Sequence, residues 1–153
     1  MTRIHERIET TLPIEAAFDY IADFATNQEW DPGTLSSTRI DDGPVGRGAR
    51  YQLHVRMGGR VAPMEYRIRD YQRPDRVVLV GRGSGVDAVD DIRFERTDRG
   101  TLIDYTADIR LGGLLRFAQP FLGGTFARIG RAAATGMTRT LASRADGTDG
   151  TAA

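Results

Sequence analysis

The sequence contains neither cysteine nor lysine. The missing cysteine excludes disulfides, thiolate metal ligands and a cysteine nucleophile. Because every basic residue is arginine, Schiff-base chemistry and a lysine general base are excluded as well. Much of the usual catalytic repertoire is therefore absent from this chain.

A net charge and long apolar runs are also missing. The 21 basic residues balance 21 acidic ones, so no long-range field attracts a phosphate backbone and we expect no nucleic-acid partner. In the most apolar region the longest uncharged stretch is Phe117–Ala127, whereas a transmembrane helix needs about 20 residues. We therefore expect no transmembrane segment. The residues after Met1 form no apolar signal sequence, which favours a cytoplasmic location.

Histidine is scarce, and His5 and His54 are the only two. Both fall in the register of the charged, solvent-facing residues, and their spacing is not that of metal ligands. We expect no metal and no cofactor. Gly83-Ser84-Gly85 lies between two predicted strands and is interpreted as a hairpin turn, since no nucleophile-elbow motif is present.

The 153 residues are enough for one domain, which we place at residues 1–143. The remaining residues, 144–153, are small and polar, and they are expected to form a disordered tail.

The hydrophobic pattern changes its period along the chain. Residues 3–11 alternate like a strand, Pro13 can open a first short helix, and Asp23 can cap a second one over 24–30. To about residue 111 the period is two, with Gly- and Pro-rich turns that separate six strands. Apolar residues then recur every three or four positions to Leu141, and Pro120 should kink or break the beginning of this long helix.

These elements predict an α+β fold. It consists of a seven-stranded, curved antiparallel sheet that grips a long C-terminal helix, with two short helices after the first strand.

Several segments are typical of one family. They are residues 11–24 and 27–32, the loop 43–48, and Arg73–Arg76 before an apolar strand. Together with the order of elements, they resemble the polyketide cyclase/dehydrase (SRPBCC) branch of the START-like, helix-grip superfamily, over about residues 3–143. The resemblance implies a cavity for an apolar ligand between sheet and helix. It implies no particular reaction, because the family includes lipid carriers, hormone receptors and aromatase/cyclases that share the fold but no catalytic motif.

Candidate polar residues of this cavity follow from the strand register. Asp90 and Asp91 are adjacent, so they point to opposite faces, and the apolar neighbours select Asp90 as the inward one. Glu6 is inward by the same argument. Each of these two carboxylates either contacts a polar ligand group, pairs with an inward arginine or lies at a solvated rim. A buried phenol keeps a hydrogen-bond partner, so the inward tyrosines can supply a polar handle in an apolar site; they are Tyr51, Tyr66 and Tyr105. Simple core packing explains the tyrosines equally well.

Trp30 ends the second short helix, where it either contacts a ligand or anchors the helices. The apolar lining is expected to come from Leu53, Val55, Met64, Ile109, Phe121 and Leu122. Because Pro120 and the following glycines weaken the start of the long helix, Phe121 and Leu122 are candidates to gate the cavity. The alternative is a plain kink that fits the helix to the curved sheet.

Two functions remain open at this point. The first is binding of a small, mostly apolar molecule, lipid-like or aromatic, by a monomer or homodimer. The alternative is an aromatase/cyclase that acts on a polyketide-like substrate, with Asp90 or Tyr66 as the candidate proton-transfer group.

Overall fold

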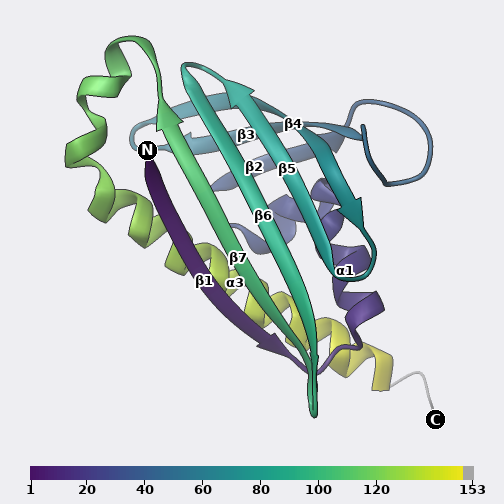
Figure 1. Cartoon of the computed structure of the whole chain (residues 1–153). Coiled ribbons are helices and arrows are strands. Elements are labelled where there is room, and N and C mark those ends of the chain that lie inside the picture. The colour runs from purple at the N-terminus through teal and green to yellow at the C-terminus, as the bar shows by residue number, and fades with distance from the viewer. Residues whose placement is uncertain (150–153) are drawn as a thin grey trace.

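The structure of the chain is a computed structural model, and it describes residues 1–149. The elements, in chain order, are β1 (Thr2–Thr10), α1 (Ile14–Ala22), η1 (Phe24–Thr26), α2 (Asn27–Trp30), β2 (Thr34–Arg39), β3 (Arg50–Met57), β4 (Arg60–Gln72), β5 (Arg76–Gly83), β6 (Val86–Thr97), β7 (Gly100–Leu111), η2 (Gly113–Phe117), η3 (Gln119–Phe121) and α3 (Gly123–Asp149). The three η segments are short 3₁₀ helices. Figure 1 shows this order from the N-terminus to the long final helix.

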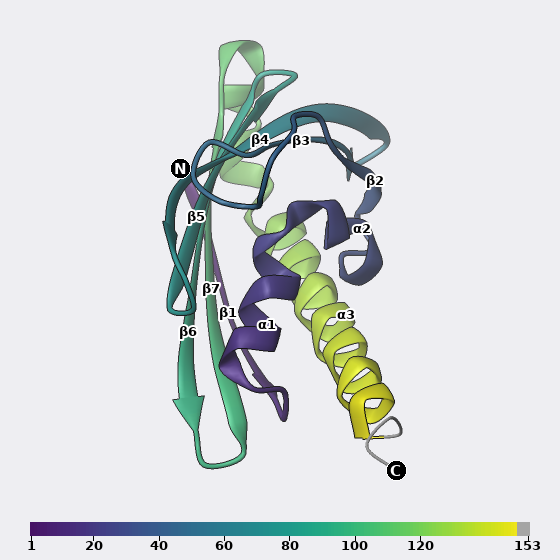
Figure 2. The same cartoon turned by 90° about the vertical axis from the view of Figure 1, so that its right-hand side faces the viewer.

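The strands form one seven-stranded sheet in the order β1-β7-β6-β5-β4-β3-β2, and all neighbours are antiparallel. Strands β2 to β7 follow one another as hairpins, and β1 adds to the edge beside β7. Register shifts at Ile68/Asp70 and Thr34/Ser36 mark bulges, which bend strands. Figure 2 shows the result: β2, β3 and β4 curl over α3, and all three α-helices lie on the concave side. The predicted fold class is confirmed.

The two faces of the sheet differ as the period-two pattern predicts. Along β4, buried and exposed residues alternate from Ala62 to Arg69. On the convex face, Arg76 donates two hydrogen bonds to Asp91, at 2.9 and 2.8 Å. Asp91 therefore points outward, and its neighbour Asp90 is buried on the concave face, as the register predicts.

The short helices begin and end where the sequence signals lie. Pro13 precedes α1, and the Asp23 carboxylate accepts a hydrogen bond from the backbone N–H of Ala25, which caps η1. After α2, the carboxylate of Asp31 accepts a bond of 2.8 Å from the N–H of Gly33 and so closes the turn into β2.

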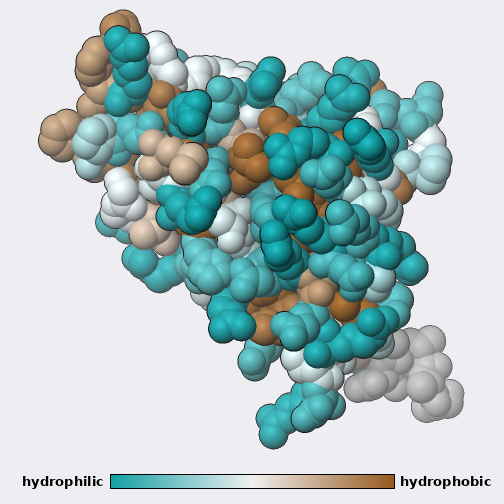
Figure 3. All heavy atoms as spheres, in the orientation of Figure 1, coloured by the Kyte–Doolittle hydropathy of each residue, from teal (hydrophilic) through white to brown (hydrophobic). Residues whose placement is uncertain are grey.

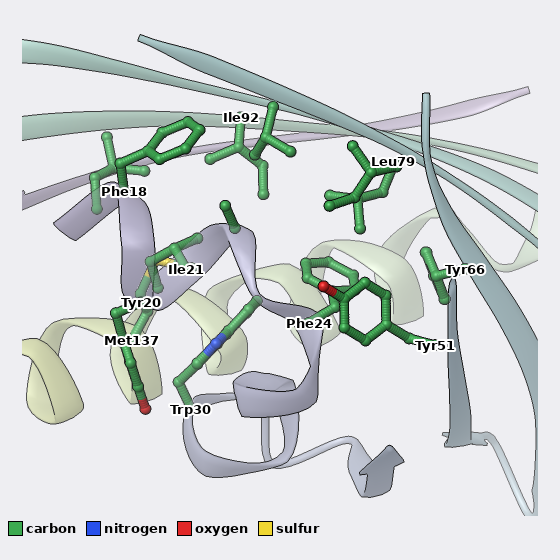
Figure 4. Packing of buried hydrophobic residues seen from close by; sticks show 14 of the residues in the cluster. Phe18, Tyr20, Ile21, Phe24, Trp30, Tyr51, Tyr66, Leu79, Ile92 and Met137 are labelled. Atoms are coloured by element: carbon green, nitrogen blue, oxygen red, sulfur yellow. The ribbon is translucent and has the colours of Figure 1, made fainter. Parts of the chain in front are cut away.

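Aromatic side chains fill the concave side where α1 and η1 lie. Phe18 of α1 packs edge-on against Phe94, with ring centroids 5.1 Å apart, and Phe24 packs against Tyr66 at 5.2 Å. Figure 4 shows this cluster between the sheet and the helices, with Met137 of α3 on its far side. This aromatic part of the core therefore lies on the concave side of the sheet, next to α1 and η1.

The final helix approaches its neighbours closely because two of its glycines have no side chain. A Cβ on Gly136 would lie 2.0 Å from the carbonyl oxygen of Trp30, and one on Gly130 would lie 2.3 Å from Cγ2 of Ile4.

In residues 1–149, no helix has both the length and the apolar composition that a bilayer crossing needs.

The structure differs from the prediction at both ends of this helix. It begins at Gly123, because η2 and η3 replace its predicted first turns around Pro120. It continues to Asp149, so residues 144–149 are helical instead of belonging to a disordered tail. The guanidinium of Arg144 lies 3.9 Å from the centre of the Tyr20 ring, a tertiary contact that supports this last part. Residues 150–153 lie outside the described residues.

Candidate functional site

A cavity of about 110 Å³ lies between the concave face of the sheet, Trp30 and α3; we call it the inner cavity. Strands β1, β3, β4, β6 and β7 form its wall on the sheet side, and the buried stripe of α3 forms the other. Most of the lining is apolar. Small residues make the room, since the positions facing the space include Ala88, Ala107, Gly130, Ala133 and Ala134.

A second cavity of about 170 Å³ adjoins the first; we call it the outer cavity. Met57, Val86, Phe126 and Ile129 border both spaces. The outer cavity then reaches the hairpin turns at Gly58 and Ser84 and the start of the α3 region at Leu115 and Leu122. The four shared residues are a common border of the two cavities, and the outer cavity lies on the side of the hairpin turns and of the start of α3.

The lining of the inner cavity includes a buried carboxylate, that of Asp90. It accepts a short hydrogen bond from the Tyr105 hydroxyl of the neighbouring strand, and Asp90 is only 6% exposed. Burial raises the pKa of Asp90 to about 7, against the hydrogen bond from Tyr105, which lowers it. Asp90 can therefore both hold and release a proton near neutral pH.

Tyr66 lines the same cavity, and its position depends on a glycine across the strand pair. Tyr66 faces Gly81 of β5, and a Cβ at Gly81 would lie 2.6 Å from the ring atoms Cε1 and Cζ. Only glycine lets the ring lie flat on the sheet there. Burial, and then the charge of Asp90, raise the pKa of Tyr66, so its hydroxyl stays protonated.

Trp30 closes the inner cavity from the side of α2. It is 2% exposed, and its ring lies edge-on to Tyr105 with centroids 6.1 Å apart. Among residues 1–149, its indole N–H has no hydrogen-bond partner. Leaving a buried donor unpaired costs about 1–3 kcal/mol. Asp31 lies beside it in the lining, and burial raises the pKa of that carboxyl as well.

The structure brings together most of the predicted site residues. The inner cavity is lined by Trp30, Val55, Met64, Tyr66, Asp90, Tyr105 and Ile109. Glu6, selected by the register argument, also borders it. Leu122 borders the outer cavity instead.

The other predicted residues lie elsewhere. Tyr51 and Leu53 are buried in the core and border neither cavity, and the ring of Phe24 from η1 packs against Tyr51 with centroids 6.4 Å apart. Phe121 is 85% exposed and borders neither cavity, because η3 turns it outward. It therefore cannot line the cavity as predicted.

Some lining residues were absent from the predicted site. The buried stripe of the long helix supplies Phe126, Ile129, Ala133 and Met137, all of which its three-to-four-residue spacing marks as inward. Small residues at inward strand positions, such as Ala88 and Ala107, carry the other usable signal. Nothing local marks Gly81, since its role depends on a ring from another strand.

The chain was compared with known families and structures. The family model described as "Polyketide cyclase / dehydrase and lipid transport" matches residues 1–142. No curated protein matches the chain. A START superfamily protein from Mycobacterium smegmatis is similar in fold, with a TM-score of 0.77 at 12% identity over 92% of this chain and 97% of that one.

Two further solved structures show the same fold. The Zhui aromatase/cyclase from Streptomyces sp. R1128 has a TM-score of 0.71 at 14% identity, covering 91% of this chain and 92% of its own. TTHA0849 from Thermus thermophilus has a TM-score of 0.71 at 12% identity, covering 92% of this chain and 95% of its own. With the family model spanning nearly the whole sequence, this chain belongs to the polyketide cyclase/dehydrase and lipid transport family.

Proposed function

We propose that this protein binds a small, mostly apolar molecule whose single polar group lies at the Asp90 end of the inner cavity. The observation that carries the proposal is a mostly apolar cavity whose lining holds a few polar groups, chief among them the buried, hydrogen-bonded pair of Asp90 and Tyr105 with Tyr66 in the same lining. Binding sites for small molecules commonly combine apolar walls with a few placed polar groups.

The polar end favours a ligand group that both donates and accepts hydrogen bonds. The protonated hydroxyl of Tyr66 can donate, and the carboxylate of Asp90 can accept. A hydroxyl satisfies both. The lipid-like or aromatic body of the ligand would then extend past Met57 and Phe126 into the outer cavity.

Ligand binding can be tested directly, because Trp30 is the only tryptophan and reports on the site. Mass spectrometry of the purified protein should detect a retained small molecule of this kind. In a titration with a saturated primary alcohol, Trp30 fluorescence should change at lower concentration than with the alkane of the same length.

A matched pair of variants on α3 makes the test specific. Ala133→Leu places a larger side chain in the inner cavity and should abolish the response, whereas Ala132→Leu, at an exposed neighbouring position, should leave it unchanged. An equal response from both variants, or no retained or added ligand at all, would refute the proposal.

A second candidate function is an aromatase/cyclase reaction on a polyketide-like substrate. The observation that favours it is Asp90, which is buried against the Tyr105 hydroxyl with a pKa of about 7, suited to general acid–base catalysis. The cavity would hold the chain folded while Asp90 or Tyr66 moves protons.

Substitutions separate the two functions. If the protein is an enzyme, Asp90→Asn or Tyr66→Phe should lower turnover by about 10²–10⁴-fold while Trp30 fluorescence still reports binding. Unchanged turnover in both variants would remove these residues from any catalytic role.

A further inference from the structure

Large apolar side chains gather at the end of the molecule where β7 leads into α3. Leu114 is 87% exposed, Phe121 85% and Phe117 64%. Leu115 of η2 is exposed as well, and so is Val61 at the start of β4. We call these five residues the tip patch. Figure 3 shows hydrophobic side chains clustered at the corner that the η2–η3 segment occupies in Figure 1. Contiguous exposed apolar surface of this kind marks an interaction site.

Hydrogen bonds hold this segment in place. The Gln119 side chain donates to the carbonyl of Ile109 at 2.7 Å and to the Thr2 hydroxyl at 3.2 Å, and it accepts from the N–H of Leu111 at 3.2 Å. These bonds fix η2 and η3 to the edge formed by β1 and β7. Leu114, Phe117 and Phe121 are thus presented outward by a fixed segment.

The segment that carries most of the tip patch contains basic residues but no acidic one. Between Ile109 and Ala145 the sequence has no acidic residue, although the whole chain is neutral, and its arginines there are Arg110, Arg116, Arg128, Arg131, Arg139 and Arg144. Arg116 lies over the Phe117 ring at 4.8 Å. Arg60 lies next to Val61 in the lining that Leu115 shares, and within residues 1–149 no ion pair involves Arg60 or Arg116, both of which are exposed.

The tip patch also borders the mouth of the outer cavity. Val61 and Leu115 belong to both, and Leu122 lines the cavity just behind Phe121. An apolar molecule that leaves a lipid phase at this point would reach the cavity without crossing water.

We propose that the tip patch docks this protein on the surface of an anionic lipid bilayer. Phe117, Phe121 and Leu114 insert among the acyl chains, and the arginines contact the anionic headgroups. A second copy of the chain fits less well, because a symmetric contact would bring the same arginines together. Docking itself needs no ligand, and only the passage of a ligand into the cavity rests on the proposed function.

Sedimentation of the full chain with vesicles tests the docking. The protein should sediment with vesicles that contain phosphatidylglycerol, bind those of pure phosphatidylcholine much more weakly, and be released by high salt. Phe117→Ser/Phe121→Ser should weaken binding at least tenfold, and Arg116→Glu on the order of tenfold.

Matched controls lie away from the patch. Leu35→Ser, at a half-exposed position of β2, and Arg99→Glu, in the hairpin between β6 and β7, should bind vesicles like the unaltered chain. All the patch substitutions are at exposed positions, so their thermal unfolding and their Trp30 response to ligand should be unchanged. A negative result for vesicle docking can therefore be distinguished from a negative result for ligand binding.

The proposal is overturned if the chain does not bind anionic vesicles, or if the patch and control variants bind them equally. It is also overturned if the patch substitutions change only the mass of the protein in solution, which would assign the patch to a second copy.

Discussion

At the residue scale, the inner cavity combines an aspartate that keeps its proton near neutral pH with a glycine that makes room for a tyrosine ring. Burial raises the pKa of Asp90 although the hydrogen bond from Tyr105 lowers it, and the ring of Tyr66 covers Gly81. Both features have measurable consequences.

The pKa of Asp90 predicts how stability depends on pH. In the unfolded chain Asp90 ionises near 3.8, whereas in the folded chain it keeps its proton to about pH 7, so the folded state binds more protons between these values. The contribution of this residue therefore falls as the pH rises through that window, by up to about 4 kcal/mol. The Asp90→Asn variant cannot ionise at this position. Its free energy of unfolding should therefore rise relative to that of the unaltered chain as the pH increases from about 4 to about 7.

Denaturant unfolding at several pH values measures this difference. Comparing the two proteins at each pH cancels the other carboxylates, including Asp91, whose pKa the Arg76 side chain lowers. A difference that stays constant with pH would contradict the assignment.

Gly81→Ala should remove ligand binding. The added Cβ would lie 2.6 Å from the Tyr66 ring, so the ring must move into the inner cavity, at a cost of about 1–3 kcal/mol in stability. Tyr66→Ala combined with Gly81→Ala should recover part of that stability in a double-mutant cycle. Gly59→Ala, where no atom lies within 4 Å, is the control. Normal ligand binding by Gly81→Ala would show that the ring does not define the cavity.

At the element scale, the second half of α3 packs closely against the backbone of α2, whereas the segment before α3 has weak local structure. Gly136 brings the helix against the carbonyl of Trp30, and the Thr140 hydroxyl donates to the carbonyl of Glu29 at 3.2 Å. Toward the start of the helix, η2 and η3 contain no buried residue. The two regions should therefore respond differently to substitution and to exchange.

Two glycines of the same helix should give opposite results when changed to alanine. Gly136→Ala places a Cβ 2.0 Å from a backbone oxygen that no rotamer change can move, so it should destabilise the protein by about 1–3 kcal/mol. Gly124→Ala meets nothing within 4 Å and should stabilise it by up to about 1 kcal/mol through helix propensity. Thermal unfolding of both variants measures this. Equal effects would mean that the approach of α3 to α2 is not tight.

Amide exchange should be faster over residues 117–125 than over 128–141. The first range has 3₁₀ turns, Pro120 and two exposed glycines, whereas the second buries Met137 and Leu141 against the core. Ligand should slow exchange at Leu122, which borders the outer cavity. Equal protection in both ranges, unaffected by ligand, would refute a local opening in this segment.

At the scale of the whole molecule, the sheet and the helices do not fill the space that they enclose. The core occupies the side of α1, and the cavities lie along α3. Unfilled apolar space lowers stability, which is the cost of a site that can take a ligand.

A larger side chain that fills the inner cavity should therefore stabilise the ligand-free protein and prevent ligand binding. Ala133→Leu should raise the melting temperature of the ligand-free protein. Ligand at about 100 times its Kd should raise the free energy of unfolding of the unaltered chain by about 2.7 kcal/mol and leave that of Ala133→Leu unchanged. Calorimetry with and without the alcohol measures both effects. A ligand-dependent shift that survives in Ala133→Leu would place the binding site elsewhere.

Local signals determined the elements and their faces. Period-two alternation oriented Asp90 inward and Asp91 outward, and Asp23 and Pro120 marked the limits of helices. These features depend on neighbours within a few residues, so periodicity and capping chemistry are enough to predict them.

Only the tertiary structure decided which inward residues face a cavity. Tyr51 and Tyr66 share the inward register of adjacent strands and form a directly opposed pair, yet Tyr51 is in the core and Tyr66 lines the cavity. The same holds for Phe121, which we expected in the cavity lining and which the bonds of Gln119 help to hold outward. Register fixes the face of a side chain, but what packs against that face comes from elements distant in the sequence, here η1, Gly81 and α3.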